Sequence, residues 1–93
     1  MSYVVLVTPH ALDRAYERWP GEVIGLATIR REVLGALRAG RVSARKPPRF
    51  RDRAAGRCLF TWTADGRRAH VLRASTTAFA VLTLLDQAEK TAA

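Results

Sequence analysis

An Asp-Gly pair, Asp65-Gly66, lies between two apolar runs and constrains the fold more than any other feature of this chain. Asp-Gly favours a two-residue hairpin turn because its residues tolerate the positive φ angles that such a turn requires. The flanking runs are CLFTWT, residues 58–63, and RRAHVLRA, residues 67–74. A tight turn sets their register: Phe60 opposite Val71, Trp62 opposite Ala69, Thr61 opposite His70 and Cys58 opposite Arg73. One apolar face of an antiparallel sheet is then predicted to consist of Phe60, Trp62, Ala69 and Val71.

Ahead of the hairpin, the stretch VTPHALDRAYERWP predicts a helix that ends near Trp19. Thr8 suits the N-cap, and Pro9 suits the first helical position, where a missing N–H costs no hydrogen bond. Pro20 and Gly21 end the helix. Its buried stripe follows the i, i+3, i+4, i+7 spacing and is predicted to be Leu12, Ala15, Tyr16 and Trp19.

A second helix is predicted from about Thr28 to Ala39, after a loop at residues 22–27. Gly40 is a favourable terminator because glycine adopts the left-handed conformation that ends many helices. The positions predicted to face the core are Ile29, Val33, Ala36 and Leu37.

The other apolar runs complete the predicted fold. SYVVLV, residues 2–7, is rich in β-branched residues and predicts a strand. Residues 79–85 are apolar on both faces and suit either a helix or a central strand. A chain of 93 residues supports one domain with one two-layer core, and residues 87–93 are interpreted as a frayed tail. The predicted fold class is α+β: two N-terminal helices packed on a twisted, mainly antiparallel sheet of about four strands.

Composition places the chain among globular proteins, since 48% of its residues are hydrophobic. No run approaches the roughly 18 apolar residues of a membrane span, so no membrane partner is expected. The start of the chain lacks the basic segment of a signal peptide. Cys58 is the one cysteine, so no internal disulfide can form, and a cytoplasmic location is expected.

Positive charge is concentrated in one segment of the chain. The whole chain has 16 Lys and Arg against 8 Asp and Glu, a net charge of +8. Segment 41–57 has seven cations against Asp52 alone, a net of +6, which leaves nine cations against seven anions elsewhere. These cations are Arg41, Arg45, Lys46, Arg49, Arg51, Arg53 and Arg57. Such a patch indicates an acidic partner, most simply nucleic acid, and Phe50 among the arginines suits stacking on single-stranded bases.

Metal chemistry finds little support in this sequence. His10 and His70 lie 60 residues apart, and one cysteine gives no zinc-binding spacing. The chain has neither a glycine-rich phosphate loop nor the paired acidic motif of two-metal nucleases. We therefore expect no metal and no cofactor.

RNA cleavage without a metal needs a base, an acid and fixed cations around the phosphate. His10 lies in the first turn of the predicted first helix, a position that favours anions, and Arg14 and Arg18 follow on the same row. His70 and Arg73 are on the second hairpin strand. Two plainer interpretations compete with this one: His10 as a solvated surface residue, and His70 as a half-exposed strand residue hydrogen-bonded to Thr61.

Several short motifs occur together in an order that resembles a known family. They are HALDRAYER, a second helix ending in GRV, the Asp-Gly hairpin and the closing AVLTLL. Over residues 7–85 the chain resembles small bacterial toxin-like domains of the RelE-type fold, which barnase-like and colicin-type ribonucleases share. The resemblance implies two helices on an antiparallel sheet, a strand at 79–85, metal-independent cleavage or binding of RNA, and an antitoxin or immunity protein as partner. It marks His10, Arg14 and Arg18.

The expected function is therefore that of a toxin-like, metal-independent endoribonuclease that acts by 2′-OH attack. His10 and His70 would serve as base and acid, while Arg14, Arg18 and Arg73 would neutralise the phosphate. Segment 41–57 would hold the RNA backbone. Two alternatives stay open: a non-catalytic nucleic-acid-binding module, and a small inhibitor, such as a phage encodes, that binds an acidic host protein.

Overall fold

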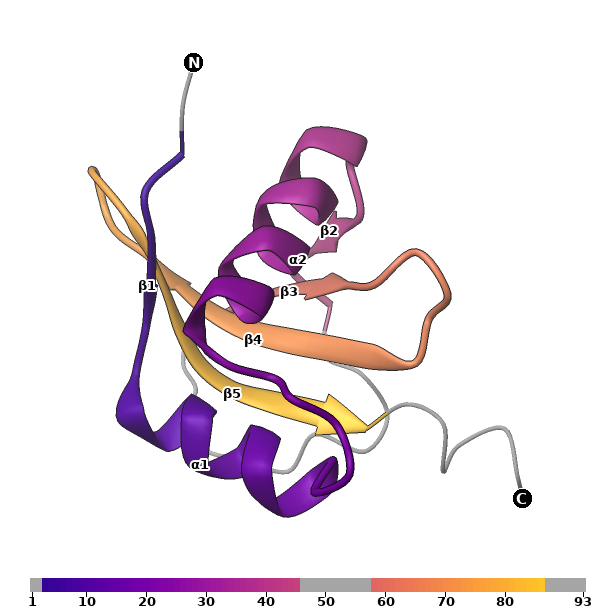
Figure 1. Ribbon diagram of the computed structural model, residues 1–93. Helices are drawn as coiled ribbons and strands as arrows, with labels where there is room; N and C mark the ends of the chain where they lie inside the picture. The colour runs from indigo at the N-terminus through magenta and orange to yellow at the C-terminus, as the bar shows by residue number, and fades with distance from the viewer. Residues whose placement is uncertain (1–2, 46–57, 87–93) are drawn as a thin grey trace.

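One mixed five-stranded sheet with two helices on one of its faces makes up the described structure (Figure 1). The computed structural model describes residues 3–45 and 58–86. In chain order the elements are β1 (Val5–Val7), α1 (Pro9–Arg18), α2 (Leu26–Ala39), β2 (Val42–Ser43), β3 (Leu59–Trp62), β4 (Arg68–Ala74) and β5 (Phe79–Asp86). The strand order is β1-β5-β4-β3-β2, and every pair is antiparallel except β1 with β5. The predicted α+β class is confirmed, with five strands in place of about four.

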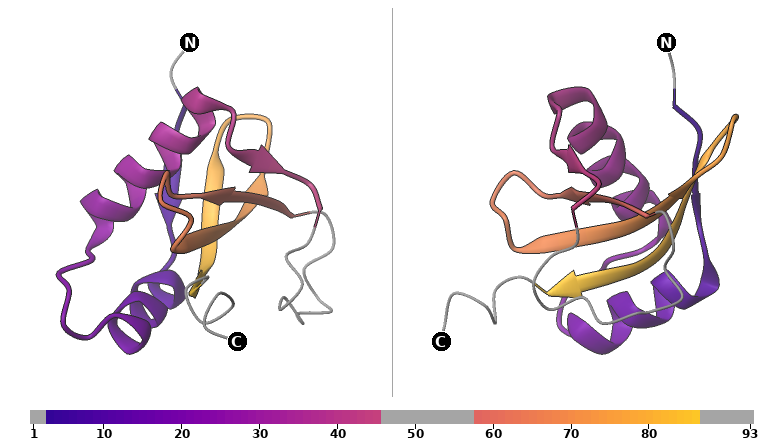
Figure 2. Two further views of the ribbon diagram at one scale, coloured as in Figure 1. Left: turned by 90° about the vertical axis from the view of Figure 1, so that its right-hand side faces the viewer. Right: turned by 180° about the vertical axis from the view of Figure 1, so that it is seen from behind.

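Both helices lie on the same side of the sheet, as the two turned views show (Figure 2). The longer helix, α2, has 14 residues, whereas a membrane span needs about 20. Within residues 3–45 and 58–86, no helix is long and apolar enough to cross a membrane.

Thr8 starts α1 as predicted and also fastens it to the sheet. Its hydroxyl accepts a hydrogen bond from the Ala11 backbone N–H at 3.2 Å and donates one to the Val81 carbonyl at 2.7 Å. The predicted buried stripe is wrong at Tyr16, which is 79% exposed. Ala11 takes its place beside Ala15 and Trp19, because small residues one turn apart let α1 pack closely on β5. This rotation of the helix turns Tyr16 outward.

The second helix begins at Leu26, two residues earlier than predicted, because Gly25 serves as its N-cap. It ends as predicted at Gly40, whose φ of 79° is the left-handed conformation that glycine adopts without strain. Ile29, Val33 and Ala36 are fully buried, which confirms the predicted inner face.

The hairpin register is confirmed at Phe60–Val71, Trp62–Ala69 and Thr61–His70. The loop is longer than the predicted two-residue turn: the Thr63 N–H bonds to the Arg68 carbonyl at 2.9 Å, and Gly66 N–H bonds back to Thr63. The loop shortens β3 and β4 by the same number of residues relative to the predicted strands. The pairing of the remaining residues is therefore the predicted one. The described β3–β4 pairs end at Leu59–Leu72, so the Cys58–Arg73 pair stays a prediction.

The strand interpretation of residues 79–85 is confirmed by β5, which lies between β1 and β4. A register shift against β4 leaves Leu82 as the extra residue of a bulge, because Val71 pairs with Thr83 and Leu72 with Val81. The bulge places Val81 and Leu84 on the same face of the sheet, and both contribute to the core beneath the helices.

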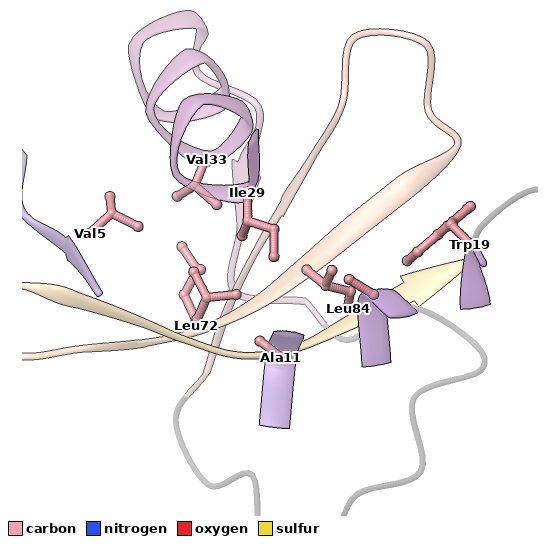
Figure 3. Close-up of a cluster of buried hydrophobic side chains, with 9 residues drawn as sticks. Val5, Ala11, Trp19, Ile29, Val33, Leu72 and Leu84 are labelled. Carbon is pink, nitrogen blue, oxygen red and sulfur yellow. The ribbon is translucent and has the colours of Figure 1, made fainter. Parts of the chain in front are cut away.

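The main core lies between the helices and the sheet (Figure 3). It is formed by Val5, Ala11, Ala15, Trp19, Ile29, Val33, Leu72, Val81 and Leu84. Phe60 and Val71 belong to a smaller cluster with Cys58, packed by Leu82 and Leu85. The hairpin face predicted from Phe60 and Val71 is therefore buried, but it is not the face that the helices cover.

Candidate nucleic-acid interface

His70 is fully buried beneath the helices, so the expectation of a half-exposed strand histidine is wrong. It shares the helix-covered face of β4 with Leu72, which explains the burial. Its Nδ1 lies 2.9 Å from the Thr61 hydroxyl, a contact that the plainer interpretation predicted, and its Nε2 lies 2.9 Å from a Glu32 carboxylate oxygen. Both ring nitrogens are therefore engaged by neighbouring side chains.

Glu32 is the centre of a half-buried polar cluster that joins α2 to β4. Burial acts to raise its pKa, but hydrogen bonds from His70 and Arg68, with the charges of both, outweigh burial and lower the pKa to about 2. An ionised carboxylate only accepts hydrogen bonds, so Nε2 of His70 carries a proton. Thr61, His70 and Glu32 thus form a hydroxyl–imidazole–carboxylate chain, yet Thr61 is fully buried and no substrate reaches its hydroxyl.

Arg68 holds the other side of this cluster. Its Nε donates to Glu32 at 2.9 Å, a second guanidinium nitrogen binds the other carboxylate oxygen, and the hydrogen bond to Glu32 raises the pKa of Arg68. The guanidinium lies 4.8 Å from the centre of the Trp19 ring, and Glu22 pairs with it at 3.6 Å. Arg68 therefore links the hairpin to α2 and to the connection between the helices.

Sequence reasoning missed Glu32 and Arg68 as partners, because 36 residues separate them. One signal in the sequence was available. Glu32 directly precedes Val33 and lies one turn before Ala36, at the margin of the buried face of α2. An acidic side chain in such a position needs a cationic partner on the sheet.

His10 and Arg14, in contrast, lie together on the outer surface of α1. Nε of Arg14 donates to Nε2 of His10 at 3.3 Å, and another guanidinium nitrogen pairs with Glu17 at 2.8 Å. Arg18, in the last turn of α1, is exposed. The structure thus brings His10 to Arg14 but leaves His70 in the core, so these histidines do not flank one accessible phosphate. Arg73 is exposed near the end of β4.

Two arginines on the outward face of α2 lie near a third that follows the helix. Arg31 and Arg38 are seven residues apart, hence on the same side of the helix and about 10.5 Å apart along its axis. Between them is Gly35, and the Arg41 guanidinium lies over it: a Cβ built on Gly35 would be 3.9 Å from an Arg41 nitrogen. Nε of Arg41 donates to the Trp62 carbonyl at 2.9 Å. We call Arg31, Arg38 and Arg41 the α2 arginine surface.

Ion pairing divides the described arginines into two groups. In the described part of the chain, Glu17, Glu22 and Glu32 pair with arginines of α1 and of the hairpin. The arginines of residues 3–45 and 58–86 that form no ion pair are Arg18, Arg30, Arg31, Arg38, Arg41, Arg45 and Arg73. Five of these seven lie between residues 30 and 45, so the unbalanced charge is concentrated on α2 and the strand after it.

The other predicted nucleic-acid-binding residues are Lys46, Arg49, Phe50, Arg51, Arg53 and Arg57, and they lie outside the described residues. Among the residues that the structure does describe, no group of three or more His, Cys, Asp and Glu could hold a metal ion.

Comparisons of the chain with protein-family models, with curated proteins and with solved structures find no match. The resemblance to RelE-type domains therefore stays a prediction from short motifs. Function has to be inferred from the side chains themselves.

Proposed function

We propose that this protein binds the phosphate backbone of RNA with the α2 arginine surface and the basic segment 41–57. The observation that carries the proposal is the set of arginines between residues 30 and 45 that have no carboxylate partner in the described structure. A polyanion supplies the missing negative charge. Guanidinium groups suit phosphate because their planar fork donates two parallel hydrogen bonds to its oxygens.

The arrangement of the unpaired arginines on the protein supports this assignment. Arg31 and Arg38 project from one side of a rigid helix, and Arg45 lies just past β2, where the basic segment continues. Arginines that only balanced the protein's own charge would pair with its carboxylates, as Arg14 and Arg68 do. Contacts of this kind recognise a charged backbone and carry little base specificity.

The affinity for a short single-stranded RNA tests the proposal. We expect Arg31→Ala/Arg38→Ala to weaken binding to a similar degree for RNAs of different sequence, because phosphate contacts are sequence-independent. Arg67→Ala, in the hairpin loop, is the control: this exposed arginine pairs with Glu22 at 3.6 Å, so the variant should bind nearly as the wild type does. Equal affinity of the α2 double variant and the wild type would refute this assignment of the surface.

RNA cleavage is a second candidate function, and the contact between His10 and Arg14 favours it. An exposed imidazole beside a guanidinium can take the proton of a ribose 2′-OH while arginines stabilise the phosphoryl charge. Because His70 is engaged by Thr61 and Glu32, this candidate gives His70 no role. Arg18 and Arg73 stay as the cations proposed with His10 and Arg14.

Cleavage is tested with purified protein and RNA in the presence of a chelator. The candidate predicts cleavage by the wild type and a loss of about 10²–10⁴-fold in His10→Ala, the usual contribution of a general base. His70→Gln should cleave at nearly the wild-type rate wherever it is folded. RNA that stays intact with the wild type would exclude the candidate and leave the binding proposal in place.

A further inference from the structure

Arg41, just after α2, is held at both ends, which distinguishes it from Arg31 and Arg38 on the helix. Arg30 is held in a similar way, because its Nε donates to the Val5 carbonyl at 3.2 Å, but it lies outside the α2 arginine surface. Gly40 turns the chain back at the end of the helix, and the Arg41 backbone N–H then bonds to the Ala36 carbonyl at 2.9 Å. At the other end, Nε donates to the Trp62 carbonyl, also at 2.9 Å. The orientation of the guanidinium is therefore set before any ligand arrives, which lowers the entropy lost on binding.

Gly35 lies next to the Arg41 guanidinium on the surface of α2. The site where a Cβ would stand is 3.9 Å from an Arg41 nitrogen, and among residues 3–45 and 58–86 this is the one contact within 4 Å. Glycine weakens a helix, and φ here does not require it, since in the part of the chain that the structure describes the left-handed glycines are Gly40 and Gly66. A longer side chain at position 35 would reach across the guanidinium, so glycine keeps its outer N–H groups open.

The surroundings of Arg41 are suited to an anion that carries repeated charge. Arg31 lies one turn before Gly35 and Arg38 one turn after it, and within the described residues none of the three arginines forms an ion pair. Because Nε of Arg41 is engaged, its two terminal nitrogens are left to bind oxygen atoms. Three guanidinium groups along two helical turns match a chain of phosphates better than a single carboxylate.

We propose that Arg41, set over Gly35 and flanked by Arg31 and Arg38, forms a preorganised subsite for one phosphate of the bound strand. This inference rests on the proposed RNA binding. It adds that Arg41 is the phosphate-binding arginine whose orientation is fixed before the strand binds. Arg31 and Arg38 then contact the neighbouring phosphates as flexible cations, whereas Arg41 sets the register of the strand on α2.

The experiment follows the arginine Nε–H signals by NMR during titration with inorganic phosphate, and then measures RNA affinity. In the wild type, the Arg41 signal should shift and saturate at a lower phosphate concentration than the other arginine signals. Arg41→Lys keeps the charge but loses the fork, so RNA affinity should fall about tenfold.

Position 35 provides a matched pair of variants. Gly35→Ala should leave phosphate and RNA binding unchanged, because its methyl group makes only an ordinary van der Waals contact with Arg41. Gly35→Glu places a carboxylate beside all three arginines, so the saturable shift should vanish and RNA affinity should fall by tenfold or more. Val23→Glu makes the same charge change at a 97% exposed position of the loop before α2 and should have a small effect.

The outcomes separate this inference from the proposed function. RNA binding by the wild type, with no saturating Arg41 shift and no loss in Arg41→Lys, would overturn the subsite and leave RNA binding in place. A wild type that does not bind RNA would overturn both. A Gly35→Glu variant that binds RNA like the wild type would also overturn the subsite, and tighter binding of poly-glutamate than of RNA would overturn phosphate as the ligand.

Discussion

Individual residues show two uses of arginine in this protein. Arg68 lies against Trp19 and bonds to Glu32, so its charge is neutralised within the fold. Within the described residues, the Arg41 guanidinium bonds only to a backbone carbonyl, through Nε, so its charge stays available to a ligand. The sequence shows both simply as arginines. What separates them is the nearest carboxylate in space, and that depends on how α2 packs against the hairpin.

Glu32 offers a test at this scale, because its pKa is lowered from 4.5 to about 2. A carboxyl group with a lowered pKa stabilises the folded state above pH 4.5, and the contribution is lost as the pH falls toward 2. We expect Glu32→Gln to lower the free energy of unfolding by about 1–3 kcal/mol at pH 6, since it removes the carboxylate that binds two nitrogens of Arg68. The difference in free energy of unfolding between the variant and the wild type should narrow as the pH falls from 4.5 to 2.

Denaturant unfolding at a series of pH values measures this difference in free energy of unfolding. Glu17→Gln is the matched control, since Glu17 pairs with Arg14 on the exposed side of α1. Surface pairs contribute little, so we expect a change below about 1 kcal/mol. A Glu32→Gln penalty that stays constant from pH 6 to pH 2 would contradict the ionised state assigned to Glu32.

The elements themselves were largely predictable, because their ends are set by local chemistry. Thr8, Gly40 and the Asp-Gly turn act within a few residues, and the structure confirms the helix starts or ends and the register that they predict. Tyr16 and His70 were misplaced for a different reason. Apolar spacing on α1 allows two rotations of the helix, and strand alternation does not say which face the helices cover. Both choices are made by tertiary packing.

Thr8 provides the test at the scale of elements, since it caps α1 and bonds to β5 with the same hydroxyl. Thr8→Ala loses both bonds, and we expect the free energy of unfolding to fall by about 1–3 kcal/mol. Thr8→Ser keeps the hydroxyl and should recover most of this loss. Tyr16→Ala should change stability by less than about 0.5 kcal/mol, because its side chain is exposed. Thermal or denaturant unfolding distinguishes these cases, and a large Tyr16→Ala effect would contradict the rotation of α1.

For the whole molecule, composition already indicated an acidic partner, whereas the place of contact required the fold. The Glu32 cluster joins residues that are 36 and 38 apart in the chain, and no local pattern shows such a pairing. Once these pairs are formed, the charge left over within the described residues is found mainly on α2 and next to β2. The histidine pair predicted from the sequence does not form, because His70 serves the core while His10 stays on the surface.

The salt dependence of RNA binding is the most direct test of the central claim that unpaired arginines on α2 hold the RNA backbone. Each phosphate neutralised on a single strand contributes about 0.7 to the slope of log K against log salt concentration. Removing two phosphate contacts with Arg31→Ala/Arg38→Ala should therefore make the slope shallower by about 1.4. A slope equal to that of the wild type would contradict the claim.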